Sequence, residues 1–149
     1  ILNKWSVKSS GLMLEITESA IMSDVARATD TVNQLHDMGL RISIDDFGTG
    51  YTSLSYIRRL PVSEIKVDKS FVLNMLEVND DAVIVRSIVE LGHNLGLSVV
   101  AEGIEDIETW NLLSDLKCNT AQGYFISRPV DAASLSEWAA DGTWCPPGN

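Results

Sequence analysis

Apolar residues recur at helical spacing in two long segments of this chain. Within residues 24–38 they are Val25, Ala28, Val32, Leu35 and Met38, and residues 80–95 repeat the same spacing of three or four positions. A period of 3.6 residues is typical of a helix with one buried face. We therefore predict amphipathic helices over these two segments, and shorter helices over residues 53–60, 106–116 and 132–140.

Short runs of β-prone residues alternate with these helices. Three of them cover residues 12–17, 41–46 and 98–103, and each follows a glycine and reaches an acidic residue near its end. Glycine directly after a helix is the usual residue for the left-handed turn that ends it. Two more strands are predicted over residues 63–68 and 118–124. Alternating helices and strands predict βα units on a parallel sheet, about five in all.

The two faces of the predicted strands differ in polarity, because successive side chains of a strand point to opposite faces. In the second strand Ile42 and Ile44 share one face, whereas Ser43 and Asp45 share the other, and the third strand is divided in the same way around Lys66. A sheet covered by helices on both faces would have almost continuously apolar strands. The pattern instead favours an α/β fold in which the sheet is part of a (β/α) barrel, with polar side chains lining a site at the carboxyl-terminal rim.

The composition fits one globular domain. The chain has 149 residues, a mean hydropathy of +0.07 and no apolar run of the roughly 18 residues that a membrane span requires. Asp and Glu number 21 against 11 Lys and Arg, which argues against DNA as a partner because nucleic-acid binding requires a cationic surface. We expect a cytoplasmic domain over residues 1–141 without membrane insertion, a flexible tail over residues 142–149, and free thiols at Cys118 and Cys145.

Acidic residues gather where the predicted strands end. The strand ends carry, in chain order, Glu15, Asp45, Asp46, Lys66, Glu102 and Gln122. Parallel strands end on the same rim, so these side chains are expected to converge although they are far apart in the sequence. Carboxylates brought together repel one another unless protons or cations compensate. Hard oxygen ligands favour Mg²⁺, Mn²⁺ or Ca²⁺, and neither His36 nor His93 stands at a strand end where it could recruit zinc.

Lys66 is a cation that the strand parity directs among these carboxylates. In that position it could hold or help to deprotonate a nucleophilic water, as hydrolysis of a phosphodiester by two metal ions requires. The adjacent Asp45 and Asp46 suit a pair of ions, because side-chain parity relaxes where a strand turns into a loop. Gly48 and Gly50 in that loop permit tight backbone geometry beside a ligand.

Five segments together resemble the EAL domain, the bacterial family of cyclic di-GMP phosphodiesterases. They are LEITES at residues 14–19, DDFGTGY at 45–51, KVDKSF at 66–71, AEGIE at 101–105 and QGYFISRP at 122–129. The resemblance covers residues 12–129. It implies a modified (β/α)8 barrel and the hydrolysis of cyclic di-GMP to linear pGpG with Mg²⁺ or Mn²⁺, two ions in a complete domain.

The resemblance also implies roles for the rim residues. Glu15 and Asp45 are similar to metal ligands, and Asp46 is similar to a ligand of the second ion. Lys66 resembles the residue that contacts the attacking water, and Glu102 resembles a second-site ligand or base.

Three more residues resemble supporting members of the site. Glu18 is expected to brace the loop after Asp46, and Glu105 and Gln122 are expected to lie beside the substrate. For Glu105 a second interpretation stays open, because an acid that opens a helix stabilises the helix dipole without any chemistry.

The chain departs from the family pattern in one respect. The Glu-Ala-Leu motif that names the family, with its glutamate ligand and following arginine, is absent from these residues, and so is an upstream asparagine ligand. A barrel of eight strands takes about 250 residues, so we expect only the later five units here. Such a piece would expose sheet edges, which favours self-association or pairing with sensory or GGDEF-type domains of a parent protein. Alone, it is expected to be catalytically impaired.

Two rival interpretations remain. The chain could be a non-catalytic module that senses cyclic di-GMP or binds a protein partner, which the missing ligands favour. An unrelated magnesium barrel of the enolase type has less support, because Lys66 is the one candidate lysine at the rim.

Overall fold

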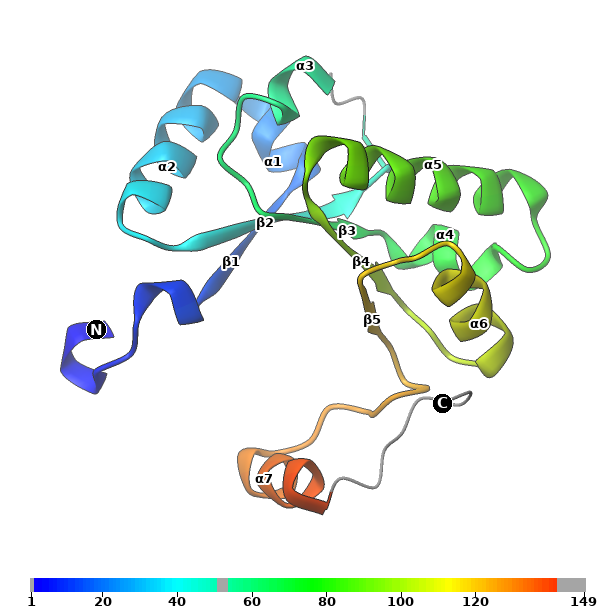
Figure 1. The fold of residues 1–149 in the computed structure, drawn as a ribbon. Coiled ribbons are helices and arrows are strands. Elements are labelled where there is room, and N and C mark those ends of the chain that lie inside the picture. The colour runs from blue at the N-terminus through cyan, green and yellow to red at the C-terminus, as the bar shows by residue number, and fades with distance from the viewer. Residues whose placement is uncertain (1, 51–53, 142–149) are drawn as a thin grey trace.

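Five parallel strands form one sheet in the computed structural model, which describes residues 2–50 and 54–141 (Figure 1). The strands are β1 (Met13–Thr17), β2 (Arg41–Phe47), β3 (Glu64–Val67), β4 (Ser98–Glu102) and β5 (Thr120–Gln122), hydrogen-bonded in that order. The five predicted strands are confirmed, and the sheet is open, with β1 and β5 at its edges. An α/β fold with part of a (β/α) barrel is therefore confirmed. The predicted tail over residues 142–149, with Cys145, lies outside the described residues.

The predicted helices are present, and the structure adds shorter ones. The predicted helices are α2 (Val25–Asp37), α3 (Leu54–Ile57), α5 (Asn79–Leu95), α6 (Ile107–Asp115) and α7 (Ala132–Asp141). The additional elements are α1 (Glu18–Ser23), α4 (Lys69–Asn74) and the 3-10 turns η1 (Leu2–Trp5) and η2 (Ser9–Gly11). The helices α1 and α4 have 6 residues each, too few for a helical period to show in the sequence. Within the described ranges, no helix has the length and apolar character needed to cross a bilayer.

Polar residues at the strand ends start the two short helices. Thr17 ends β1 and caps α1, and Asp68 follows β3 and caps α4. These side chains satisfy backbone N–H donors that the first helical turn leaves without a partner. At the other end of a βα unit, Gly96 terminates α5 with a φ of 74°, a left-handed conformation that glycine adopts without strain. Tight connections of this kind return the chain directly to the sheet.

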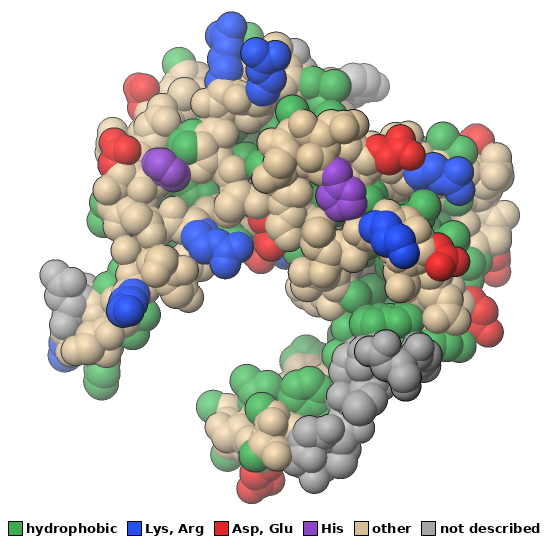
Figure 2. All heavy atoms as spheres, in the orientation of Figure 1, with side chains coloured by type: hydrophobic (Ala, Val, Ile, Leu, Met, Phe, Trp, Pro, Cys, Tyr) green, Lys and Arg blue, Asp and Glu red, His purple; other side chains and the backbone are tan. Residues whose placement is uncertain are grey.

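The sheet is curved, and its two sides differ. Helices α1 to α6 lie on one side, whereas the other side faces the open space between the N-terminal turns and α7 (Figure 1). In the space-filling view this space is a hollow bordered by the N-terminal segment and α7 (Figure 2). The arrangement is that of a barrel wall, with helices outside and the inner face uncovered.

Alternate residues of the strands form the core together with the helices. Ile44, Val67 and Ala101 are fully buried, and they belong to one apolar cluster with Val32 of α2 and Val85 of α5. The alternation read from the sequence therefore separates the helix-covered face from the inner face correctly.

Gly92 of α5 provides a test of this packing. A Cβ atom at this position would collide with Val99 Cγ2 and approach Ile65 Cδ1 to 3.1 Å. We expect Gly92→Ala to lower the free energy of unfolding by about 1–3 kcal/mol, because the helix must move away from the sheet. Urea denaturation measures the change. Asn94→Ala, an exposed position of the same helix, is the control and should stay within about 0.5 kcal/mol of the original chain; equal stability of Gly92→Ala would contradict the packing.

Candidate active site at the strand rim

The predicted rim residues come together where neighbouring strands end. Parallel pairing places Thr17 of β1 opposite Asp45 of β2, and Glu102 of β4 opposite Gln122 of β5. Because all the strands run in the same direction, the side chains near their carboxyl ends share one rim.

Lys66 of β3 is the centre of this rim. Its Nζ lies 2.9 Å from Glu15 Oε1, 3.2 Å from Asp45 Oδ1 and 2.6 Å from Glu102 Oε1. The three carboxylates come from β1, β2 and β4, so one ammonium connects four strands. A lysine ammonium has three N–H donors, which matches the number of carboxylates around it.

The surroundings of Lys66 determine its protonation. Burial acts to lower the pKa of Lys66, but the hydrogen bonds to the three carboxylates outweigh it and raise the pKa above the usual 10.5. The side chain therefore stays charged at neutral pH. Of the two tasks considered for Lys66, holding a water fits this state, because a charged ammonium has no lone pair with which to accept a proton.

Asp46 lies in a distortion of β2. The register between β2 and β3 shifts between Ile44 and Phe47, and Asp46 has a φ of 54° in the left-handed region. Parity thus relaxes at Asp45 and Asp46, as the sequence suggests. The pKa of Asp46 is raised, first by burial and then by the negative charges of Asp45 and Asp68. Asp46 is not one of the three ion-pair partners of Lys66.

Glu18 holds the loop that follows Asp46. It is the first residue of α1 and is 2% exposed. Its Oε2 accepts hydrogen bonds from the backbone N–H of Gly48 at 2.9 Å and of Gly50 at 3.2 Å. A Cβ at Gly50 would lie 2.9 Å from the Glu18 carboxylate, so glycine permits this approach. The loop that Glu18 contacts is the one that the resemblance associates with it.

The family model for the EAL domain matches residues 1–129. The chain belongs to the EAL domain family. Among curated proteins, it is 46% identical over 134 residues to the bifunctional diguanylate cyclase/cyclic di-GMP phosphodiesterase MucR of Pseudomonas aeruginosa, covering 90% of this chain and 20% of MucR. It is 40% identical over 137 residues to the oxygen sensor protein DosP of Escherichia coli, covering 92% of this chain and 17% of DosP. The chain thus spans about a fifth of these relatives.

Solved structures of EAL domains share the fold. A complex of the MucR phosphodiesterase with cyclic di-GMP has a TM-score of 0.88 and 46% identity, over 90% of this chain and 54% of that one. A complex of Klebsiella pneumoniae BlrP1 with manganese and cyclic di-GMP has a TM-score of 0.79 and 32% identity, over 86% of this chain and 33% of that one.

In this EAL domain, Glu105 and Gln122 lie beside Glu102 rather than among the ion pairs. All three line a cavity of about 260 Å³ together with Tyr124. Glu105 is exposed and precedes Asp106, which caps α6 through the backbone N–H of Thr109. Both interpretations of Glu105 remain compatible with this position.

Asp68 is a rim residue that the sequence analysis did not single out. It follows β3, accepts a hydrogen bond from the backbone N–H of Ser70 at 2.8 Å, and contributes to the raised pKa of Asp46. Its position two residues after Lys66, at the same parity, was the available signal. The helix α4 that Asp68 caps was not predicted from the sequence either.

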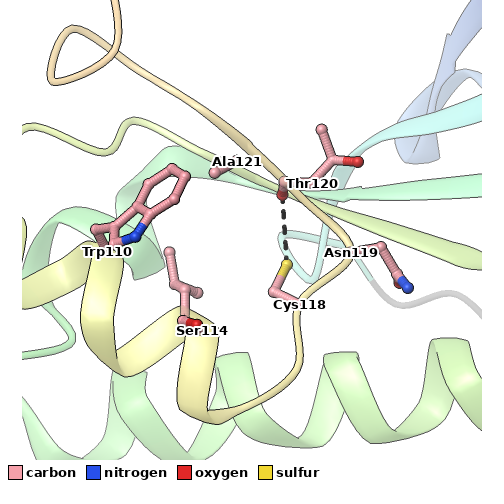
Figure 3. Close-up of a pocket in the computed structure, with 7 residues that line it drawn as sticks. Trp110, Ser114, Cys118, Asn119, Thr120 and Ala121 are labelled. Carbon is pink, nitrogen blue, oxygen red and sulfur yellow. Dashed lines mark hydrogen bonds between the residues drawn. The ribbon is translucent and has the colours of Figure 1, made fainter. Parts of the chain in front are cut away.

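A second pocket lies away from the rim, between α6 and the start of β5. It is lined by Trp110, Leu113, Ser114, Cys118, Asn119, Thr120 and Ala121 (Figure 3). Cys118 is a free cysteine, as predicted; its Sγ lies 3.5 Å from the carbonyl oxygen of Thr120, and burial raises the pKa of the thiol. The lining residues include no Asp, Glu, Lys, Arg or His.

The chemistry of the rim fits a hard divalent cation, but its arrangement differs from a formed metal site. Asp45 Oδ1 is buried with no hydrogen-bond partner besides the nearby ammonium, and carboxylate oxygens are the ligands that Mg²⁺ and Mn²⁺ prefer. Among the described residues, no group of three or more Asp, Glu, His or Cys side chains is placed to hold an ion. The point between the carboxylates is taken by Lys66 Nζ.

The contact between Glu18 and the loop can be tested. We expect Glu18→Gln to lower the free energy of unfolding by about 1–2 kcal/mol, because a neutral amide accepts hydrogen bonds more weakly than a carboxylate. The amide protons of Gly48 and Gly50 should exchange faster, which NMR hydrogen exchange measures. Glu90→Gln, an exposed position of α5, is the control. Unchanged exchange at both glycines would show that Glu18 does not hold the loop.

The raised pKa of Asp46 predicts that Asp46→Asn stabilises the folded state by an amount that depends on pH. The native state binds the proton of Asp46 more tightly than the unfolded chain does, so the original chain loses stability as the pH rises from the ordinary value of 3.8 through the raised pKa. Asn carries no charge, so the variant should be more stable near neutral pH, and this gain should disappear below about pH 4.

Urea denaturation in EDTA across this pH range measures the Asp46→Asn gain. Asparagine also tolerates a left-handed φ, but that contribution is independent of pH. Asp30→Asn, at an exposed position of α2, should show no such dependence. A constant difference between Asp46→Asn and the original chain would contradict the charge repulsion.

Proposed function

We propose that this chain supplies the catalytic rim of a cyclic di-GMP phosphodiesterase, which hydrolyses cyclic di-GMP to pGpG. The observation that supports the proposal is the convergence of Glu15, Asp45 and Glu102 on Lys66 from four adjacent strands. Three carboxylates and a lysine at one rim are suited to hydrolysis of a phosphodiester with bound cations. The choice of cyclic di-GMP as substrate is supported by relatives named as cyclic di-GMP phosphodiesterases and by a solved complex with this nucleotide.

The carboxylates would hold two divalent ions, Mg²⁺ or Mn²⁺. Glu15 and Asp45 would bind one ion, Asp46 the other, and Glu102 either binds the second ion or serves as a base. Such ions lower the pKa of a bound water and neutralise charge on the phosphate. A local positive charge is needed, because a chain with a formal net charge of -10 otherwise repels an anionic substrate.

The chain's own side chains would position the reactants. When one of its ion pairs is released, the charged Lys66 ammonium can donate the freed N–H to the attacking water and hold it beside the phosphate. Glu18 keeps the loop after Asp46 in place through Gly48 and Gly50. Gln122 and Glu105 line the cavity beside Glu102, where part of the substrate can be held.

The alternative is a module that binds cyclic di-GMP or a protein without hydrolysis. The ion pairs of Lys66 with three of the proposed ligands favour it, since these carboxylates already share the positive charge of an ammonium. In either case we propose a cytoplasmic location and association through the open edges β1 and β5, with a second copy or with sensory and GGDEF-type domains. The small share of MucR and DosP that the chain covers supports a multidomain parent.

Hydrolysis is tested with a chimera, because the chain alone is expected to have little activity. Residues 1–129 would replace the aligned segment of the MucR phosphodiesterase, and release of pGpG from cyclic di-GMP with Mn²⁺ would be followed by chromatography. We expect turnover in the chimera, and a loss of about a hundredfold or more in Asp45→Asn or Lys66→Ala. Asp115→Asn, the same change on the exposed surface of α6, should retain activity.

The outcomes separate the two functions. A folded chimera that binds cyclic di-GMP but releases no pGpG favours the non-catalytic module. Turnover that survives both Asp45→Asn and Lys66→Ala would show that the assigned residues are wrong.

A further inference from the structure

The place that a cation would take among the rim carboxylates is held by an ammonium of the chain itself. Lys66 Nζ is within 3.2 Å of one oxygen each from Glu15, Asp45 and Glu102. Mg²⁺ binds carboxylate oxygens at about 2.0–2.1 Å and requires near-ideal geometry, so it cannot take the point between these oxygens while Nζ holds it.

We infer that Lys66 is an internal counter-ion that competes with divalent cations for the rim carboxylates. It holds the rim together when no ion is bound, and it must give up some of its ion pairs when an ion binds. The inference rests on the proposed function in that it takes the carboxylates to be cation ligands. It concerns cation binding and not the hydrolysis step.

The burial of Lys66 supports its role in holding the rim together when no ion is bound. The Lys66 side chain is 7% exposed, and its three partners carry like charges that would otherwise repel one another across β1, β2 and β4. Uncompensated charges at partly buried positions strongly disfavour folding. The ammonium offsets one of these three negative charges in the absence of metal.

The exposure of the three carboxylate side chains supports the release of ion pairs when an ion binds. The side chain of Glu15 is 49% exposed, that of Asp45 22% and that of Glu102 17%. An ion arriving from solvent meets these carboxylates before it meets the more deeply buried ammonium. The ion and the ammonium therefore compete for the same carboxylates, and a stronger hold by Lys66 means a weaker net affinity for the ion.

Mn²⁺ binding to the 149-residue chain tests the competition, with the free ion measured by electron paramagnetic resonance. Lys66→Met keeps most of the side-chain volume but removes the charge, so we expect Mn²⁺ to bind about tenfold more tightly or better. Lys66→Arg keeps the charge and should bind Mn²⁺ much as the original chain does. Lys8→Met removes the same charge from an exposed position before η2, in the segment that leads into β1, and should change the affinity little.

Thermal unfolding supplies a second measurement. Without metal, Lys66→Met should melt at a lower temperature than the original chain, and Mn²⁺ should raise its melting temperature by more. If Lys66→Met is unfolded without metal, its refolding is titrated with Mn²⁺. Recovery of the folded state with Mn²⁺ supports the inference, and failure to refold at saturating Mn²⁺ counts against it.

The original chain allows a test without any variant that affects folding. The ammonium protons of Lys66, identified by their absence in Lys66→Arg, should be protected enough to give an NMR signal in ¹⁵N-lysine-labelled protein. Saturating Mg²⁺ should shift or broaden this signal as the ion pairs are released.

Any one of four results would overturn the inference. The first two are an equal or weaker affinity of folded Lys66→Met for Mn²⁺, and an increase in Mn²⁺ affinity in Lys8→Met as large as that in Lys66→Met. The others are a Lys66 signal unaffected by saturating Mg²⁺, and absence of Mn²⁺ binding in both the original chain and Lys66→Met. Release of pGpG is assayed separately, so a failure of the proposed hydrolysis leaves these binding results to be interpreted independently.

Discussion

A buried ammonium surrounded by three carboxylates is the interaction on which this rim depends. Lys66 comes from β3, and its partners come from the two strands before it and the one after it. Removing a lysine from water is unfavourable unless its charge is compensated, and gathering three carboxylates is unfavourable for the same reason. Each group makes the position of the others possible, so the rim is one electrostatic unit.

The open sheet explains why this unit is accessible. Helices α1 to α6 lie on one side of the sheet (Figure 1). Strand parity directs Lys66 to the other side, opposite the buried Ile65 and Val67. The match to 54% of the MucR phosphodiesterase chain is consistent with this geometry. At the rim, the loop after Asp46 is held by Glu18, which belongs to the short helix α1 and not to the sheet.

Particular residues show how far sequence reasoning reached. The recurrence of a glycine, a β-prone run and an acid located the strands, because each step has a local physical cause: a helix end, a pleated strand and a polar rim. The helices α1 and α4 were missed because 6 residues are too few to show a period. Asp68 was overlooked together with α4, because its capping of that helix shows only in the structure. Glu18 was associated with the correct loop through the family resemblance and not through any spacing.

By itself, the sequence determined the order of the βα units, the parity of the strands and the set of acids that share one rim. These features follow from local periodicity and from the common direction of parallel strands. Only the tertiary structure decided that Lys66 occupies the point between Glu15, Asp45 and Glu102, that its pKa is raised, and that Asp46 lies outside this group. Ion pairing and burial depend on distances between strands that are remote in the sequence, and no local pattern contains those distances.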